Sequence, residues 1–277
     1  MPIAHATDQS SSQQRSAAVG VWLCAIAMLV FIRYRGEIGL YKSLHVWMND
    51  VGLPSWVRNS DTELLLVLFG VGLYVLLRLV GGHRTRGFLS DIGLRHGVLR
   101  GVAVGVVICI PILLVGLVRG LMQDGTMFFA LKMIRVGFTG PIAEEWFFRG
   151  VLVLAMVRLV GTRFWSAAIV GALLFGAVHV QWTAEGLARG WPAVLVTGAG
   201  GVWYAWLARQ WSWNLLVPIT AHMLMNLAGP WYGGTDHALG SIYFEIGRAA
   251  TIALGTVMAI NPGLFKMGWA RGAKNEG

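Results

Sequence analysis

The chain has 277 residues, of which 56% are hydrophobic and 13% charged, and its formal net charge is +9. Soluble domains carry roughly 25% charged residues, so this composition excludes an ordinary water-soluble protein and indicates a chain that faces lipid. The basic residues lie in short segments between apolar runs, which is the usual placement of orienting charges in a membrane protein. The positive charge is therefore no evidence of nucleic-acid binding, and we expect no nucleic-acid partner.

The order of polar and apolar segments predicts a polytopic, all-α membrane protein. Residues 1–16 are polar and rich in Ser and Gln, and predict a disordered N-terminal tail. Residues 17–265 predict a single transmembrane domain, and 266–277 a basic C-terminal tail. A helix needs roughly 20 apolar residues to cross a bilayer. About eight apolar stretches approach that length: 17–34, 62–80, 98–119, 141–158, 164–180, 191–208, 213–230 and 244–264.

Two further segments do not suit a membrane span. Residues 43–61 contain Trp47 and Pro54 and suit a position at the membrane interface. Residues 125–139 carry Lys132 and other polar groups in mid-run, which predicts a short interfacial or re-entrant helix.

The stretch "TGPIAEEWFFRGVLVL" places charges inside an apolar helix. A charge near the bilayer centre costs roughly 2.5–3.5 kcal/mol on insertion scales, so intramembrane acids are candidates for function. Glu145 and Arg149 are four residues apart and can pair on one helix face. Glu144 is turned by about 100° from Glu145 around the helix. The pairing of Glu145 with Arg149 therefore does not explain why Glu144 is present.

Two histidines also lie in or at the ends of apolar helices, namely His179 and His222. Phe175 precedes His179 by four residues, and Asn226 follows His222 by four, so each pair shares a helix face. If the helices alternate in direction across the membrane, Glu144, His179 and His222 all lie in the same leaflet. A lone helix histidine is more often structural than catalytic, but the set predicts a common site within residues 140–230.

These side chains suit the hydrolysis of a peptide bond. A carboxylate can act as general base toward water, and a nearby imidazole can share that task or protonate the leaving amine. A second imidazole and an amide NH₂ can donate hydrogen bonds to the developing oxyanion. No Ser or Cys nucleophile is indicated.

The ordered set Glu-Glu-x-x-x-Arg, Phe-x-x-x-His and His-x-x-x-Asn resembles the CPBP family of intramembrane proteases, which includes the type II CAAX prenyl endopeptidases. The resemblance covers residues 140–230 and implies a glutamate-dependent endopeptidase with an eight-helix fold. It implies that Glu144 and His179 activate water and that His222 and Asn226 form the oxyanion site. Glu145, Arg149 and Phe175 would support them.

The resemblance also implies a substrate and a location. The substrate would be a membrane-anchored or lipidated protein or peptide, trimmed at a C-terminal or anchored segment near the interface. The protein would lie in the bilayer of a bacterial inner membrane as a multi-pass protein. No cofactor is expected, although two His and a carboxylate can also hold Zn²⁺, which leaves a metal as a minority alternative.

Two interpretations from other functional classes also remain possible for this sequence. The first is a non-catalytic scaffold, or a bacteriocin-immunity membrane protein, that keeps the fold. The second is a proton-coupled transporter that uses Glu144 and the histidines as a relay, although the chain shows no inverted repeat or paired broken helices.

Overall fold

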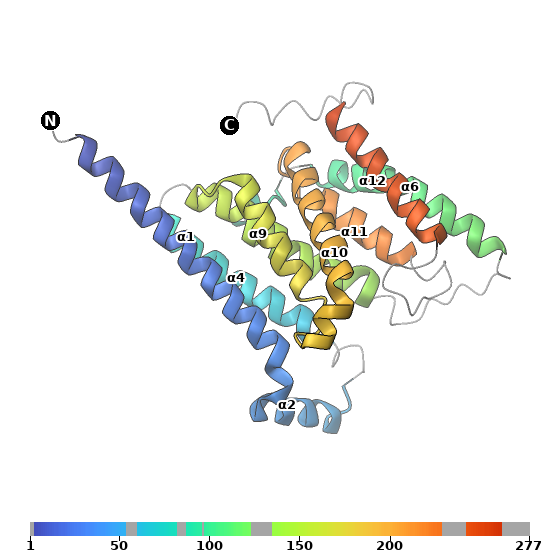
Figure 1. The fold of residues 1–277 in the computed structure, drawn as a ribbon, viewed down its shortest axis with the longest axis horizontal. Coiled ribbons are helices and arrows are strands. Elements are labelled where there is room, and N and C mark those ends of the chain that lie inside the picture. The colour runs from blue at the N-terminus through green and yellow to red at the C-terminus, as the bar shows by residue number, and fades with distance from the viewer. Residues whose placement is uncertain are drawn as a thin grey trace. The chain divides into compact units, whose positions relative to one another are not determined.

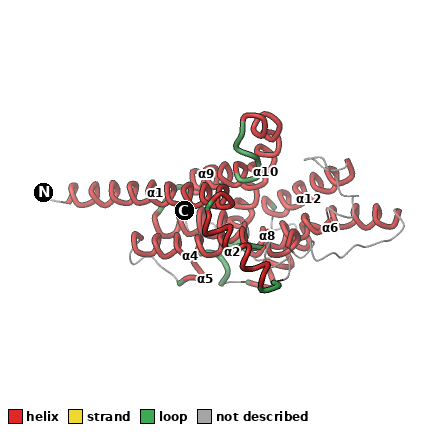
Figure 2. Tube along the Cα trace, turned by 90° about the horizontal axis from the view of Figure 1, so that it is seen from below, coloured by secondary structure: helices red, strands yellow, loops and turns green. Residues whose placement is uncertain are grey.

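The computed structural model describes residues 3–53, 60–81, 87–95, 97–122, 135–228 and 242–261. Within these ranges the chain is helical and contains no strand (Figure 2). Four segments of the described residues are long and apolar enough to cross a membrane: Ser16–Glu37, Asp61–Gly81, Val98–Val118 and Ile242–Ile260. The predicted all-α, polytopic membrane fold is therefore confirmed.

Helices make up most of the described residues. In chain order they are α1 (Ile3–Tyr34), η1 (Arg35–Glu37), α2 (Gly39–Asp50), α4 (Asp61–Gly81), α5 (Phe88–Asp91), α6 (Val98–Met122), η3 (Arg135–Thr139), α8 (Gly140–Glu144), η4 (Glu145–Val160), α9 (Phe164–Ala177), α10 (Ala184–Gln210), α11 (Leu216–Ala228) and α12 (Ile242–Ile260). Both η3 and η4 are π-helices, whereas η1 is a 3₁₀-helix.

Each of the eight predicted spans coincides with helical structure, but the number that cross the bilayer stays a prediction. The apolar helices α9 and α11 are shorter than a full span, with 14 and 13 residues. The predicted interfacial segment overlaps α2 and reaches into residues 54–59, which lie outside the described residues. So do 123–134, most of the predicted re-entrant segment, and the C-terminal tail at 266–277.

α1 begins at Ile3 and continues without a break to Tyr34, and so includes most of the predicted N-terminal tail. The predicted division into two tails and one transmembrane domain stays a prediction. Extending a helix that already exists adds one hydrogen bond for each residue fixed, and so avoids the cost of nucleation. The apolar part of the helix begins at Ser16, close to the predicted start of the first span. Composition located the lipid-facing part but not the start of the helix.

The chain divides into two compact units, each built from two separate stretches. Unit 1 comprises Met1–Ile92 and Trp146–Gly201, and unit 2 comprises Gly93–Glu145 and Val202–Gly277. In unit 1, α1 runs beside α4 (Figure 1), and Phe31 meets Phe69 edge-on at 5.8 Å between ring centroids. Glycine lets α4 approach η4 closely, since a Cβ on Gly70 would lie 2.4 Å from the indole nitrogen of Trp146.

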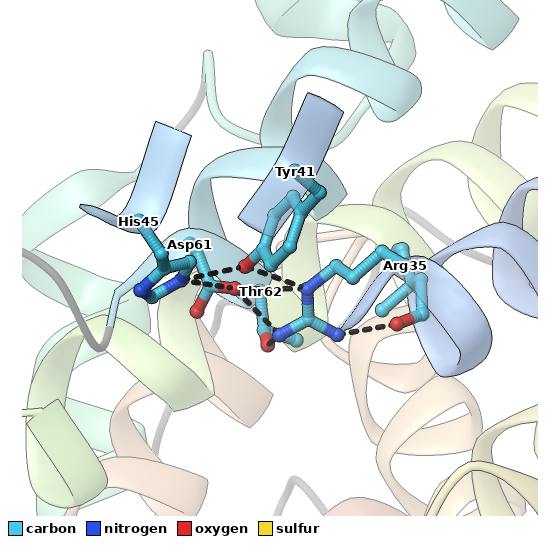
Figure 3. A network of polar contacts seen from close by, with 6 residues as sticks. Arg35, Tyr41, His45, Asp61 and Thr62 are labelled. Atoms are coloured by element: carbon cyan, nitrogen blue, oxygen red, sulfur yellow. Dashed lines mark hydrogen bonds and ion pairs between the residues drawn. The ribbon is translucent and has the colours of Figure 1, made fainter. Parts of the chain in front are cut away.

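A polar cluster, here called the Arg35 junction, ties α1, α2 and α4 together within unit 1 (Figure 3). Arg35 donates to Asp61 Oδ2 from Nε at 2.8 Å and from Nη2 at 2.6 Å, and to the Thr62 hydroxyl at 2.7 Å. The Tyr41 hydroxyl lies 2.9 Å from Arg35 Nε and 3.1 Å from His45 Nε2. Asp61 is the first residue of α4, where the helix dipole also favours a negative charge.

In unit 2, α6 packs against α11 and α12. Gly101 and Gly105 are four residues apart on α6 and therefore share one face. A Cβ on Gly101 would lie 2.8 Å from Leu216 Cβ, and one on Gly105 would lie 2.6 Å from Thr220 Cβ. Small residues with this spacing let two helix backbones approach closely in a membrane. This contact fixes the position of α11, which carries His222 and Asn226.

Candidate active site

The two adjacent glutamates lie where the helix changes type. Glu144 is the last residue of the α-helix α8, and Glu145 is the first residue of the π-helix η4. Pro141 lies in the first turn of α8, where its missing N–H loses no helical hydrogen bond. The side chain of Glu145 is fully buried, whereas that of Glu144 is 26% exposed. The two carboxylates differ in exposure because successive residues of a helix point in directions about 100° apart.

His222 of α11 contacts both glutamates within unit 2. Its Nδ1 lies 2.9 Å from Oε1 of Glu145, and its Nε2 lies 3.8 Å from Oε2 of Glu144. A carboxylate accepts hydrogen bonds, so the short contact assigns a proton to Nδ1 and leaves Nε2 directed toward Glu144. Glu145 thereby sets both the tautomer and the orientation of the ring.

The distance of 3.8 Å between His222 and Glu144 exceeds that of a direct hydrogen bond. The contact therefore places the second ring nitrogen of His222 beside the partly exposed carboxylate of Glu144 without a direct hydrogen bond between them.

Tyr204, in the part of α10 that belongs to unit 2, supports the same histidine. Its ring stacks on the imidazole of His222 with 5.3 Å between centroids and 22° between planes. Tyr204 is only 7% exposed, and its hydroxyl donates to the sulfur of Met225 at 3.1 Å. The motif spacing gave no signal for this residue, because Tyr204 lies on another helix in an aromatic-rich stretch.

Asn226 lies one turn after His222 on α11 and is half-buried. α11 contacts both α8 and η3. Beside Asn226, Leu227 packs so tightly on Gly137 of η3 that a Cβ there would lie 2.3 Å from the leucine Cδ2. α11 begins at Leu216, and Pro218 lies in its first turn, where a proline is tolerated. The proline therefore begins the helix instead of bending it.

His179 belongs to unit 1 and follows the end of α9. Its Nδ1 donates to the carbonyl oxygen of Phe175 at 2.7 Å, and the two rings meet edge-on with 4.6 Å between centroids. This hydrogen bond assigns the proton to Nδ1 and makes Nε2 the basic nitrogen. His179 is exposed, so Nε2 has the tautomer and the accessibility that a general base requires.

Arg149 of η4 is buried at 2% exposure and also packs on Phe175. Its guanidinium carbon lies 4.1 Å from the ring centroid of Phe175, within the range of a cation–π contact. Its Nε donates to the carbonyl oxygen of Gly201 at 3.4 Å, and a Cβ on Gly201 would lie 3.0 Å from Nη2. Gly201 makes room for the guanidinium, and only its place in a glycine-rich stretch could have indicated it.

The structure thus brings some of the predicted site residues together and leaves other contacts as predictions. In unit 2, Glu144 and Glu145 lie beside His222, and Asn226 follows on the same helix. In unit 1, Phe175 contacts both His179 and Arg149. The predicted meeting of His179 with Glu144, and the predicted pairing of Glu145 with Arg149, would each join residues of different units, and both stay predictions.

The described residues contain no group of three or more His, Cys, Asp or Glu side chains arranged to hold a metal ion. His222 meets the two glutamates through different ring nitrogens, so those two contacts point in different directions. The zinc alternative therefore stays a prediction, and an experiment with chelators is needed to decide it.

Comparison with known proteins supplies independent information on residues 126–228. This range matches the family model described as Rce1-like, type II CAAX prenyl endopeptidase Rce1-like, and it includes every predicted site residue. No curated protein and no solved structure matches the chain. Residues 126–228 are therefore similar to the Rce1-like family of type II CAAX prenyl endopeptidases, which supports a CAAX-type intramembrane protease at the level of the family.

Proposed function

We propose that this protein is an intramembrane endopeptidase in which Glu144 activates a water molecule to hydrolyse a peptide bond near the membrane interface. The observation that carries the proposal is the 3.8 Å separation between Glu144 Oε2 and His222 Nε2, with His222 held by Glu145 at 2.9 Å. Amide hydrolysis uses such groups, a carboxylate and an oriented imidazole close to each other, for general acid–base catalysis. The Rce1-like domain supports the same class of reaction.

In the proposed first step, Glu144 accepts a proton from water while the water oxygen attacks the scissile carbonyl carbon. His179 shares the proton through Nε2, because its Nδ1 proton is engaged by the carbonyl oxygen of Phe175. The carbonyl oxygen gains negative charge and becomes an oxyanion. General acid–base groups of this kind contribute roughly 10²–10⁴-fold to a rate.

His222 and Asn226 are proposed to stabilise that oxyanion. His222 can donate from Nε2 when it carries a proton on both nitrogens, with the Nδ1 proton directed at Glu145. Asn226 contributes its amide NH₂ from the next turn of α11. The proton taken up from water then moves to the amine, the C–N bond breaks, and the products are a new carboxylate and a new amine.

The proposed substrate is a membrane-anchored or lipidated protein or peptide in a multi-pass enzyme of a cell membrane. Four helices of spanning length and composition support an enzyme that meets its substrate at the bilayer. We propose that the enzyme trims a C-terminal or anchored segment, since the scissile peptide bond must reach the depth in the membrane at which the glutamates and histidines lie. The reaction needs no cofactor in this mechanism.

Mass spectrometry of membrane proteins tests this function. Cells that express the wild-type chain are compared with cells that express Glu144→Gln at the same level. We expect a substrate whose terminus is shortened only with the wild type, and hydrolysis in H₂¹⁸O should place ¹⁸O in its new carboxylate. Cleavage that continues at the wild-type rate with Glu144→Gln would contradict the proposal. Activity that strong chelators abolish and added zinc restores would favour the metal alternative.

A further inference from the structure

The orientation of the His222 ring depends on a second contact besides its hydrogen bond to Glu145. That hydrogen bond joins His222 Nδ1 to Glu145 Oε1 at 2.9 Å, and it does not by itself fix the tilt of the ring about the line between the two atoms. The ring of Tyr204 stacks on the imidazole with 5.3 Å between centroids and 22° between planes. Because this stack opposes a change of tilt, the two contacts together hold Nε2 near Glu144, 3.8 Å away.

Tyr204 also contacts α11 at Met225. Its hydroxyl donates to the Met225 sulfur at 3.1 Å. His222 and Met225 are three residues apart and share a helix face, so Tyr204 spans the turn of α11 that precedes Asn226. Tyr204 is 7% exposed and belongs to the buried hydrophobic core of unit 2. The position of its ring is therefore set by the packing of this unit.

Trp203, the preceding residue, connects Tyr204 to α12. Successive residues of a helix point about 100° apart, so Trp203 can meet α12 while Tyr204 meets α11. The indole nitrogen of Trp203 donates to the Thr256 hydroxyl at 3.1 Å. Gly255 makes room for the indole, since a Cβ there would lie 2.8 Å from Trp203 Cζ2. The rings of Trp203 and Tyr204 are 5.2 Å apart between centroids, so α12, Trp203, Tyr204 and His222 form one continuous series of contacts.

We propose that α12 positions His222 through Trp203 and Tyr204, and that Tyr204 is the positioning residue that fixes the plane of the imidazole. α12 runs from Ile242 to Ile260 and lies outside residues 126–228, the range that matches the family model. Its effect on the reaction rests on the proposed function. The orientation of the ring can be measured independently of any reaction.

Kinetics of two Tyr204 variants test the role of the ring. Tyr204→Leu removes the stack and should lower kcat by about fivefold to tenfold with little change in KM, since an aromatic pair contributes beyond the area that it buries. Tyr204→Phe keeps the stack and loses only the hydroxyl, so it should retain most of kcat. The measurement is cleavage of a tail-anchored peptide in proteoliposomes, with Tm as a check of folding.

A spectroscopic measurement that needs no turnover accompanies the kinetics. The full chain is labelled with ¹³C at Cε1 of histidine, and the signal of His222 is identified as the one that is missing in His222→Gln. Stacking against an aromatic ring shifts the proton on Cε1 upfield. This upfield shift should be present in the wild type and in Tyr204→Phe, and lost in Tyr204→Leu.

Variants of Thr256 test whether α12 acts through Trp203. Thr256→Val removes the acceptor of the indole N–H and should lower kcat by about threefold, the effect of one neutral hydrogen bond. It should also reduce the upfield shift of the His222 signal. Thr256→Ser keeps the hydroxyl and should restore both.

Thr251→Val is the matched control. Thr251 is a fully buried threonine of the same helix, but its hydroxyl accepts a hydrogen bond from the Ile112 N–H at 3.2 Å. Its loss should lower Tm and leave kcat and the His222 signal unchanged.

A wild-type kcat and His222 signal in both Tyr204→Leu and Thr256→Val would overturn the proposal. Equal losses of kcat in Thr256→Val and Thr251→Val would also overturn it, because the effect would then be general destabilisation. Loss of the upfield shift with a wild-type kcat would overturn the role in the reaction, while Glu144→Gln still tests the proposed function separately. If the wild type cleaves no peptide, the proposed function fails, and the His222 signal alone decides whether α12 positions the ring.

Discussion

Two histidine–carboxylate pairs of this protein have the same separation but different neighbours. In the Arg35 junction, His45 Nε2 lies 3.8 Å from Asp61 Oδ2, and in the candidate active site His222 Nε2 lies 3.8 Å from Glu144 Oε2. In the first pair an arginine binds the carboxylate, at 2.6 Å (Figure 3). In the second pair a further carboxylate, Glu145, binds the histidine at 2.9 Å.

This difference distinguishes a structural ion pair from the pair that we propose to be reactive. Asp61 accepts two hydrogen bonds from Arg35, so its negative charge is compensated and it fixes three helices in place. At the other site, the additional residue Glu145 orients the imidazole and does not neutralise Glu144. The distance between the histidine and the carboxylate therefore does not distinguish the two sites. The neighbouring group does, because Arg35 binds the carboxylate at one site and Glu145 binds the histidine at the other.

The largest expected effect is that of Glu144→Gln on cleavage. This change keeps the size of the side chain but removes the base, and should lower kcat by roughly 10²–10⁴-fold. The measurement is the rate of cleavage of a tail-anchored substrate in proteoliposomes, with Tm as a check of folding. Asp61→Asn is the control for loss of a carboxylate beside a histidine, and it should leave kcat unchanged. Equal losses in both variants would contradict the comparison.

Asn226→Ala should have the next largest effect. Loss of one oxyanion donor typically lowers kcat by roughly 10²–10³-fold, with little change in KM. Asn49→Ala, at an exposed position on α2, provides the control. A variant that raises KM and leaves kcat unchanged would show that Asn226 binds substrate and does not stabilise the oxyanion.

Glu145→Gln should lower both stability and activity, because His222 loses its charged partner. A hydrogen bond to a charged group contributes roughly 1.5–3 kcal/mol, so we expect a lower Tm and a loss of about tenfold in kcat. Thermal unfolding in detergent and cleavage assays on the same preparation measure the two effects. Glu185→Gln, where the side chain is 73% exposed, should change neither. An unchanged Tm for Glu145→Gln would mean that His222 is oriented by other contacts.

Asp61→Asn should give the smallest effect of the series. Arg35 and Asp61 have side chains 19% and 16% exposed, and the change replaces a doubly bonded carboxylate by a neutral amide. Partly exposed ion pairs contribute on the order of 1 kcal/mol, so Tm should fall by a few degrees while kcat is retained. Asp50→Asn, on an exposed turn of α2, should leave Tm unchanged. A loss of cleavage in Asp61→Asn would give the Arg35 junction a role in catalysis.

The sequence predicted the helices well because each apolar run is long and bounded by polar segments. The run at 62–80 corresponds closely to α4 at Asp61–Gly81, and 164–180 to α9 at Phe164–Ala177. The change to a π-helix at Glu145 was not predicted, because the pattern of apolar residues does not distinguish one helix type from another in so apolar a stretch.

The candidate site could be predicted only as a set of residue types. Spacing on one helix related His222 to Asn226 and His179 to Phe175, since neighbours in sequence share a face. Spacing could not show that His222 contacts Glu145, because that contact joins two helices 77 residues apart. For the same reason the spacing predicted Arg149, on the same helix, as the partner of Glu145 and gave no indication of Tyr204.

The close packing of α6 on α11 also limits how a substrate can reach His222. Thr220 and Leu216 of α11 lie against Gly105 and Gly101, so these two backbones are closely packed. A peptide that must approach α11 cannot use the seam between this pair as a portal without breaking that whole stripe of contacts. The entry route is therefore expected along another side of α11. Bulky residues introduced at Gly101 or Gly105 would disturb the position of α11 without blocking that route.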